Sequence, residues 1–156
     1  MEERIDSGLE SCKNLLELCL VEFDEQDFSA ISKLSSVREL KVKTSSVKST
    51  LGLEGCESLE SLLLGNCRKL ASIKHIGGHV ALRTLHIDGS KKISDFDVLD
   101  NLSSLEVLIL IDCGEVPSLK FLNKFPSLRE IRIFGRTKIL DDDLSALERI
   151  ETVVLP

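Results

Sequence analysis

The amino-acid sequence predicts an α/β solenoid, in which short parallel strands stack on one side and narrow returns stack on the other. Two observations favour it: an apolar pattern that recurs along the 156 residues, and a core composition that is almost wholly aliphatic. Hydrophobic residues make up 42% of the chain but aromatic residues only 4%, all of them Phe. A regular aliphatic core is typical of repeat proteins, in which each unit packs on its neighbours.

The recurring pattern is apolar-x-x-apolar-x-apolar. Its copies are Leu15/Leu18/Leu20, Val37/Leu40/Val42, Leu59/Leu62/Leu64, Leu82/Leu85/Ile87, Leu105/Leu108/Leu110, Leu128/Ile131/Ile133 and Ile150/Val153/Leu155. Alternation within each copy indicates a strand, and apolar residues at every third position between copies favour 3₁₀ or extended turns over α-helix. We expect one domain, residues 1–156, with strands near residues 15–21, 37–43, 59–65, 82–88, 105–111, 128–134 and 150–155.

Two copies, "LESLLLGNC" (59–67) and "LEVLILIDC" (105–113), match the leucine-rich repeat pattern L-x-x-L-x-L-x-x-N/C. The chain resembles this family over nearly its whole length, and its 22–23-residue units resemble those of bacterial internalins and of phosphatase-regulatory leucine-rich proteins. The resemblance implies a right-handed horseshoe with a parallel concave sheet and an irregular or 3₁₀ convex side. The Asn/Cys position varies and is occupied by Phe23, Ser45, Cys67, Ser90, Cys113 and Arg136.

The charge of the chain is uneven. Its net value is −6, but residues 1–30 hold nine acidic residues against Arg4 and Lys13, which makes −7 for this stretch. An acidic end argues against nucleic acid as the partner. The chain begins without the basic start and apolar run of a secretory signal, and it has no apolar stretch of membrane-spanning length. We therefore expect a cytoplasmic protein with no membrane partner and with reduced cysteines.

The five cysteines are predicted to be structural, with one exception. Cys12 and Cys56 occupy leucine positions that should be buried, and Cys67 and Cys113 occupy the turn position. Equivalent positions two repeats apart lie about 10 Å apart at about 4.8 Å per strand. A disulfide needs Cα atoms within about 7 Å, so neither pair can form one. Cys19 is expected to point outward and to be the most reactive thiol.

Other polar groups do not form a catalytic or metal-binding set. His75 and His79 have the i, i+4 spacing of helical metal ligands, but two glycines between them oppose a helix. His86 and Asp88 should lie together on an open sheet, where no pocket encloses them. The run Asp141–Asp143 precedes "LSALERI" and is best interpreted as a helix cap. We expect no enzyme activity, no cofactor and no metal.

Strand phase identifies the residues that a partner could contact. Positions three, five and seven of each copy should face the concave side. In the fifth copy all three are apolar, although the repeat does not require it, and charged residues should surround them. An apolar centre with a charged rim is typical of a protein-binding surface. The candidate partner-binding residues are Leu63, His86, Asp88, Val107, Ile109, Ile111, Arg132 and Phe134.

Two interpretations of this surface remain open besides partner binding. The apolar row could be covered by another segment or by a second copy of the protein, or it could reflect β-propensity alone. The segment "FGRTKILDDDLSALERI" (134–150) resembles the closing segment of small bacterial leucine-rich repeat proteins that accompany secreted or contact-delivered toxins. The sequence thus indicates a non-enzymatic scaffold that binds another protein, in its sharpest form an immunity-like protein that neutralises a bacterial toxin. The alternative is a structural or self-associating adaptor, such as a regulatory subunit, effector or homodimer.

Overall fold

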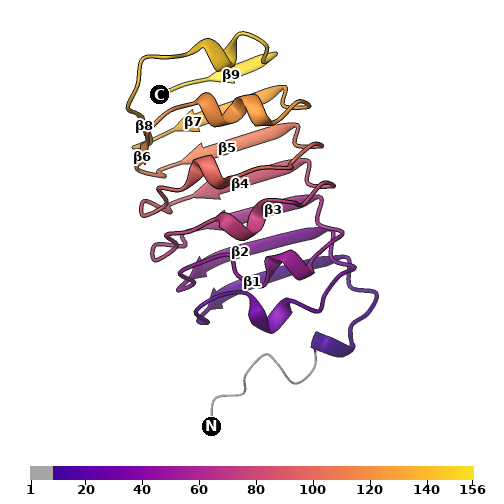
Figure 1. Cartoon of the computed structure of the whole chain (residues 1–156). Coiled ribbons are helices and arrows are strands. Elements are labelled where there is room, and N and C mark those ends of the chain that lie inside the picture. The colour runs from indigo at the N-terminus through magenta and orange to yellow at the C-terminus, as the bar shows by residue number, and fades with distance from the viewer. Residues whose placement is uncertain (1–8) are drawn as a thin grey trace.

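The computed structural model describes residues 9–156 and forms a solenoid (Figure 1). A parallel seven-stranded sheet runs along one side, with its strands in chain order. These strands are β1 (Glu17–Phe23), β2 (Glu39–Ser45), β3 (Ser61–Gly65), β4 (Thr84–Asp88), β5 (Val107–Ile111), β7 (Glu130–Phe134) and β9 (Thr152–Val154). A second parallel pair, β6 (Glu115–Val116) and β8 (Lys138–Ile139), joins two turns beside the main sheet.

Each main strand begins two residues later than the sequence pattern predicts. In the second to sixth repeats, two successive N–H groups, such as those of Glu60 and Ser61, donate to one carbonyl oxygen of the preceding repeat. For these two nitrogens the acceptor is the Arg38 carbonyl, at 2.8 and 2.9 Å. The first two residues of each copy therefore lie in a bend, and the regular ladder begins only at the third.

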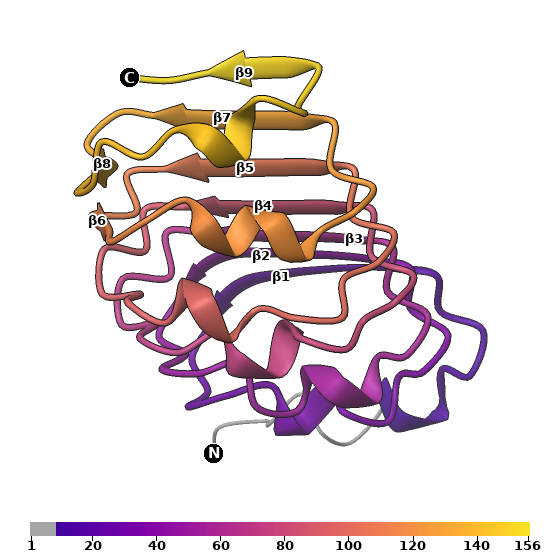
Figure 2. The same cartoon turned by 45° about the horizontal axis from the view of Figure 1, so that its top comes forward.

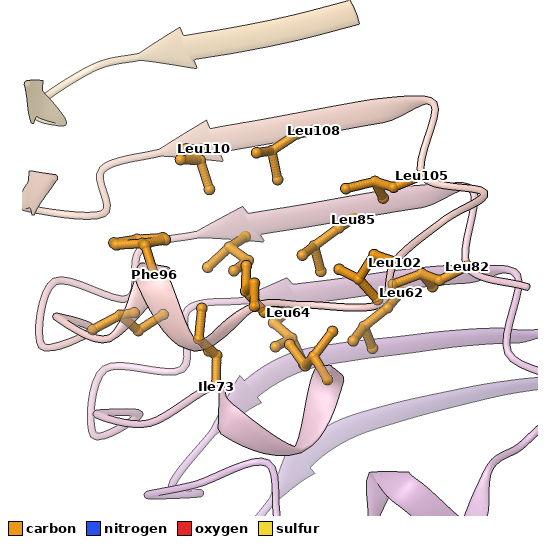
Figure 3. Packing of buried hydrophobic residues seen from close by; sticks show 14 of the residues in the cluster. Leu62, Leu64, Ile73, Leu82, Leu85, Phe96, Leu102, Leu105, Leu108 and Leu110 are labelled. Atoms are coloured by element: carbon orange, nitrogen blue, oxygen red, sulfur yellow. The ribbon is translucent and has the colours of Figure 1, made fainter. Parts of the chain in front are cut away.

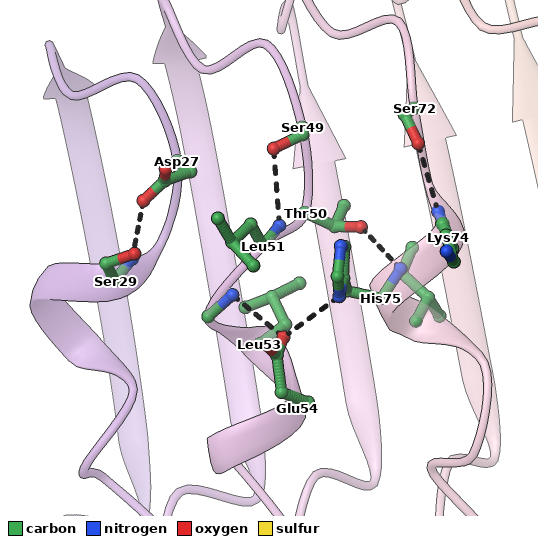
Figure 4. Close-up of polar contacts among 12 residues, drawn as sticks. Asp27, Ser29, Ser49, Thr50, Leu51, Leu53, Glu54, Ser72, Lys74 and His75 are labelled. Atoms are coloured by element: carbon green, nitrogen blue, oxygen red, sulfur yellow. Dashed lines mark hydrogen bonds and ion pairs between the residues drawn. The ribbon is translucent and has the colours of Figure 1, made fainter.

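Short 3₁₀ helices line the opposite side, as the three-residue spacing predicts (Figure 2). They are η2 (Leu9–Ser11), η3 (Ser29–Ile31), η4 (Leu53–Gly55), η5 (Lys74–Ile76), η6 (Phe96–Val98), η7 (Lys120–Lys124) and η8 (Ser145–Leu147). At the start of four of them, the N–H of the first helical residue donates to the side chain of the residue two positions before it. These acceptors are Asp27, Ser72, Ser118 and Asp143. Of the run Asp141–Asp143 that was expected to cap a helix, Asp143 bonds to the first N–H of η8, but the cap position itself is Leu144. Figure 4 shows the bonds of Asp27 and Ser72.

The core lies between the sheet and the helices (Figure 3). The register aligns Leu62, Leu85 and Leu108 on adjacent strands, and all three side chains are fully buried. Burying one such side chain stabilises the fold by about 1.5–3 kcal/mol. The terminal repeats are less well covered: Leu18 is only partly buried, and Val153 of β9 is 39% exposed. The stacking of repeats, more than any single repeat, therefore builds the core.

Charged residues alternate along the amino edge of the sheet. From the second copy onward, the second position holds Arg38, Glu60, Arg83, Glu106, Arg129 and Glu151. The Glu106 carboxylate pairs with both Arg83 and Arg129, each at 2.7 Å. Arg38 pairs with Glu60 at 3.5 Å. Each exposed pair contributes about 0.2–1 kcal/mol, so the alternation matters more for strand order than for total stability.

Candidate protein-binding surface

The face of the main sheet that points away from the 3₁₀ helices is open, and we call it the open face. It is the face that the sequence predicts as concave. On β5, Leu108 and Leu110 are fully buried, whereas Val107, Ile109 and Ile111 are partly exposed. The strand phase deduced from the repeat is therefore correct.

The parallel register places the fifth-repeat residues beside charged and aromatic neighbours. Ile111 of β5 lies beside Phe134 of β7, which is 36% exposed, and Ile109 lies beside Arg132 of β7. The Arg132 guanidinium forms an ion pair with Glu130 on the same strand. The open face thus carries an apolar group with a charged pair at one border.

Residues of β4 and β3 form the opposite border. His86 faces Ile109, and Asp88 faces Ile111. Leu63 lies across His86 on the next strand, so the imidazole sits between two aliphatic side chains. We define the apolar patch as Val107, Ile109, Ile111 and Phe134.

Strand phase alone would place Val154 near Ile109 and Ile111, but Val154 does not belong to this patch. It pairs with Arg132, because β9 adds to β7 and not to β5. Arg132 therefore separates Val154 from Ile109.

His86 is the least satisfied polar group of the open face. Its Nε2 atom is buried and has no hydrogen-bond partner within residues 9–156. Burial lowers the pKa of His86 below its ordinary value, and the nearby Asp88 carboxylate opposes that shift. A buried polar atom without a partner costs about 1–3 kcal/mol, so a group that bonded to this ring would be favoured there.

The first two strands give the open face a different character. Glu39 and Lys41 form an ion pair at 2.5 Å on β2. A hydrogen bond from the Lys41 ammonium to Glu39 raises the pKa of Lys41. Cys19 of β1 is exposed and lies directly across from Lys41, as its predicted outward phase requires. This end of the sheet is polar and lacks the surplus of aliphatic residues found on β5.

Three of the remaining four cysteines are buried, and their thiols should be unreactive. Burial raises the pKa of Cys56 and Cys67 to about 11 and that of Cys113 to about 12. The Cys113 thiol donates to the Ile87 carbonyl at 3.3 Å, which joins two repeats. Cys12 was expected to be buried but is exposed, because among the described residues no repeat stacks on its outer side.

The two histidines with metal-like spacing have separate partners. His75 lies 3.4 Å from the Glu54 carboxylate, and Figure 4 shows this contact. His79 is buried, and its ring nitrogens lie 2.8 and 2.9 Å from the carbonyl oxygens of Ile76 and Leu53. Within residues 9–156, no three His, Cys, Asp or Glu side chains are grouped so as to hold a metal ion. No helix in the described chain is long and apolar enough to cross a membrane.

Two solved structures of internalins from Listeria monocytogenes are similar to the chain. An internalin (inlF) gives a TM-score of 0.62 at 22% sequence identity, over 83% of this chain and 44% of that one. An internalin C2 (inlC2) gives a TM-score of 0.62 at 20% identity, over 96% of this chain and 74% of that one. The chain has the leucine-rich repeat fold.

Likeness at this level of identity establishes the leucine-rich repeat fold alone, and the chain spans less than half of the first internalin. No protein-family model matches the sequence, and no curated protein matches it. Leucine-rich repeats specify a scaffold and leave the ligand to the exposed residues. The partner must therefore be inferred from the open face itself.

Proposed function

We propose that the protein is a non-enzymatic leucine-rich repeat scaffold that binds another protein through the open face of its sheet. The observation that carries the proposal is the apolar row of β5, where Val107, Ile109 and Ile111 lie outside the core-facing positions. A soluble protein rarely exposes a contiguous apolar group of this kind unless something covers it. The proposed anchors are the apolar patch, with Leu63, His86, Asp88 and Arg132 at its border.

The proposed partner surface is apolar at its centre and polar at its edge. Aliphatic side chains of the partner would displace water from Ile109 and Ile111, and an aromatic or aliphatic group would stack on Phe134. The Arg132–Glu130 pair would lie at the rim, where it favours one orientation of the partner over others. Binding of this type needs no reaction and no cofactor.

The sharper form of the proposal is that the partner is a bacterial toxin and that the protein neutralises it. This form rests on the resemblance of residues 134–150 to the closing segment of small leucine-rich repeat proteins that accompany toxins. Phe134 opens that segment and also belongs to the apolar patch. We further propose a cytoplasmic location, in which Cys12 and Cys19 remain reduced thiols.

Self-association is the second candidate, since Val153 on the edge strand β9 is 39% exposed. An edge strand offers unpaired backbone groups to another copy. A self-associating adaptor would show a molar mass that rises with concentration in light scattering, and it would lose this behaviour on substitution of Val153.

The test of partner binding compares three aspartate substitutions on the same face, two in the apolar patch and one outside it. Ile109→Asp and Phe134→Asp each place a charge in the apolar patch. Val21→Asp places a charge outside the patch, on β1, where Val21 is already 63% exposed. Tagged protein is used to capture partners from lysate of the source cell. We expect Ile109→Asp and Phe134→Asp to lose the captured protein and Val21→Asp to keep it.

Melting and circular dichroism of all three variants check that the fold persists. For the toxin form, co-expression with the captured protein should restore growth only for the wild type and Val21→Asp. Retention of the same partner by both patch variants would contradict the assignment of the open face.

A further inference from the structure

A cleft of about 380 Å³ lies along the carboxyl ends of strands β3 to β7, beyond the open face. The repeat brings the turns that follow these strands together at one edge of the sheet. The residues that line the cleft are Asn66, Arg68, Asp88, Gly89, Lys91, Lys92, Asp112 and Arg136. Four of the eight are basic and two are acidic, in a chain whose net charge is −6.

Most of the basic groups in the cleft form no hydrogen bond or ion pair with another residue that the structure describes. Arg136 is committed to Asp112, whose Oδ1 accepts its backbone N–H at 2.8 Å and its Nε at 3.3 Å. These bonds lower the pKa of Asp112 and keep it ionised. Arg68, Lys91 and Lys92 form no hydrogen bond or ion pair within residues 9–156 and are exposed. The cleft therefore carries a net positive charge, because its two carboxylates offset only two of its four basic groups.

The floor of the cleft is formed by a turn position that recurs in successive repeats, and the glycines at this position have no room for a side chain. Asn66, Gly89, Asp112 and Gly135 occupy the same turn position of successive repeats, and all four have positive φ. A Cβ at Gly89 would lie 2.9 Å from the Asn66 side-chain oxygen, and one at Gly135 would lie 2.6 Å from that of Asp112. Glycine therefore alternates with a short polar residue, and the basic side chains flank this floor.

The basic groups are spread along the solenoid and not gathered at one point. Arg68 follows β3 and Arg136 follows β7, which is three strand spacings away. At about 4.8 Å per strand this is about 14 Å, or four to five residues of an extended chain at about 3.3 Å each. A single compact anion would contact only part of this array, whereas successive carboxylates on an extended peptide would follow all of it.

The two carboxylates in the cleft favour a peptide over a phosphate polymer. Asp88 and Asp112 would repel a phosphodiester backbone, which has no donor to offer them. A peptide carries N–H groups that these oxygens can accept, together with acidic side chains for the lysines and arginines. Asp88 also belongs to the border of the open face, so the cleft and the apolar patch are continuous.

We propose that this cleft binds an extended segment rich in Asp and Glu, which belongs to the same protein partner that covers the open face. The inference rests on the proposed function for the identity of the partner but on the cleft itself for the chemistry of the segment. Charges that face one another across an interface mainly raise the rate of association and select the partner. The cleft would thus steer an acidic partner onto the apolar patch.

The test uses a blocked hexapeptide of alternating Asp and Glu, titrated into the ¹⁵N-labelled full chain at low salt (about 20 mM), where charge interactions are least screened. We expect amide shifts centred on Gly89, Asp112 and Arg136, which disappear in high salt. The double variant Arg68→Glu/Lys92→Glu should bind the peptide at least tenfold more weakly. Lys13→Glu/Lys74→Glu makes the same change in net charge elsewhere and should bind it like the wild type.

Three outcomes would overturn the inference: no shift at these amides, an equal loss of binding in both double variants, or tighter binding of an oligothymidylate than of the peptide. The result is separable from that of the proposed function. Ile109→Asp should keep the peptide while losing the captured partner. If Ile109→Asp retained the partner but the peptide still bound in the cleft, the open-face assignment would fall and the cleft would stand.

Discussion

The Thr137 hydroxyl accepts the backbone N–H of Cys113 from the neighbouring repeat, with 2.9 Å between Oγ1 and the nitrogen. Thr137 is 2% exposed, and the bond is buried. In the preceding repeats the Asn/Cys turn position lies eight residues after the start of the copy. By that count Arg136 would occupy the turn position of this repeat. Arg136 instead pairs with Asp112 at the surface, and Thr137 satisfies the buried turn.

Thr137→Val should lower the free energy of unfolding by about 1–3 kcal/mol, because it leaves the buried Cys113 N–H without an acceptor while keeping the side-chain shape. Urea unfolding measures the change. Thr84→Val is the matched control, since Thr84 is partly exposed on the open face and its hydroxyl forms no hydrogen bond within residues 9–156. Equal effects for the two substitutions would contradict a structural role for the Thr137 hydroxyl.

Gly55→Ala should be strongly destabilising. A Cβ at Gly55 would lie 1.7 Å from the Ser32 carbonyl oxygen, so two neighbouring returns would have to separate. Overpacking of this kind costs about 1–3 kcal/mol and sometimes more. At Gly65 the nearest atom to such a Cβ is a Leu63 methyl carbon at 3.4 Å. Gly65→Ala should therefore leave the free energy of unfolding unchanged or raise it by up to about 1 kcal/mol. The melting temperatures of the two variants measure the difference.

The thiols should divide into two classes towards a disulfide reagent. Cys12 and Cys19 are exposed and should react in the native protein. Cys56, Cys67 and Cys113 are buried, and burial raises the pKa of Cys113 to about 12, so these three should react only after unfolding. Colorimetry of released thiolate, with mass mapping of the labelled sites, measures the division. Rapid native labelling of Cys113 would show that the fifth repeat opens.

The imidazole of His86 should titrate below its ordinary pKa of 6.5 in an NMR pH series. Burial is the main cause, so Ile109→Ala, which opens the adjacent surface, should raise the midpoint towards 6.5. The Asp88 carboxylate acts in the opposite direction, so Asp88→Asn should lower the midpoint further.

The same shift sets the sign of the pH dependence of stability. Because the folded state binds this proton less readily than the unfolded chain, the stability from His86 is complete above pH 6.5. It is lost as the pH falls from 6.5 through the folded-state pKa. A midpoint above 6.5 in the wild type would contradict the buried environment of the ring.

The repeat, the sheet and most of the core could be predicted, because the core positions of a solenoid recur at a constant spacing in the sequence. Leu62, Leu85 and Leu108 occupy one position of successive units and are buried together. The period could not reveal where each strand begins, since that depends on how N–H groups share a carbonyl. It also could not show that Cys12 lies in a unit without an outer neighbour among the described residues.

The open face was predictable from strand phase, but its local chemistry was not. That His86 leaves a buried ring nitrogen without a partner depends on side-chain positions that no pattern encodes. The cleft was missed, although the pairs Arg68–Lys69 and Lys91–Lys92 recur at the same place in two successive units. Charge at equivalent turn positions is the signal that could have located it.

The alternating arginines and glutamates along the amino edge give the solenoid a parity. Deleting the unit that carries Glu60 would set Arg38 beside Arg83, and deleting the one that carries Arg83 would set Glu60 beside Glu106. Like charges on adjacent strands repel. Removing two consecutive units would restore the alternation. The chain should therefore tolerate gain or loss of repeats in even numbers better than in odd ones, as if its true building block were a pair.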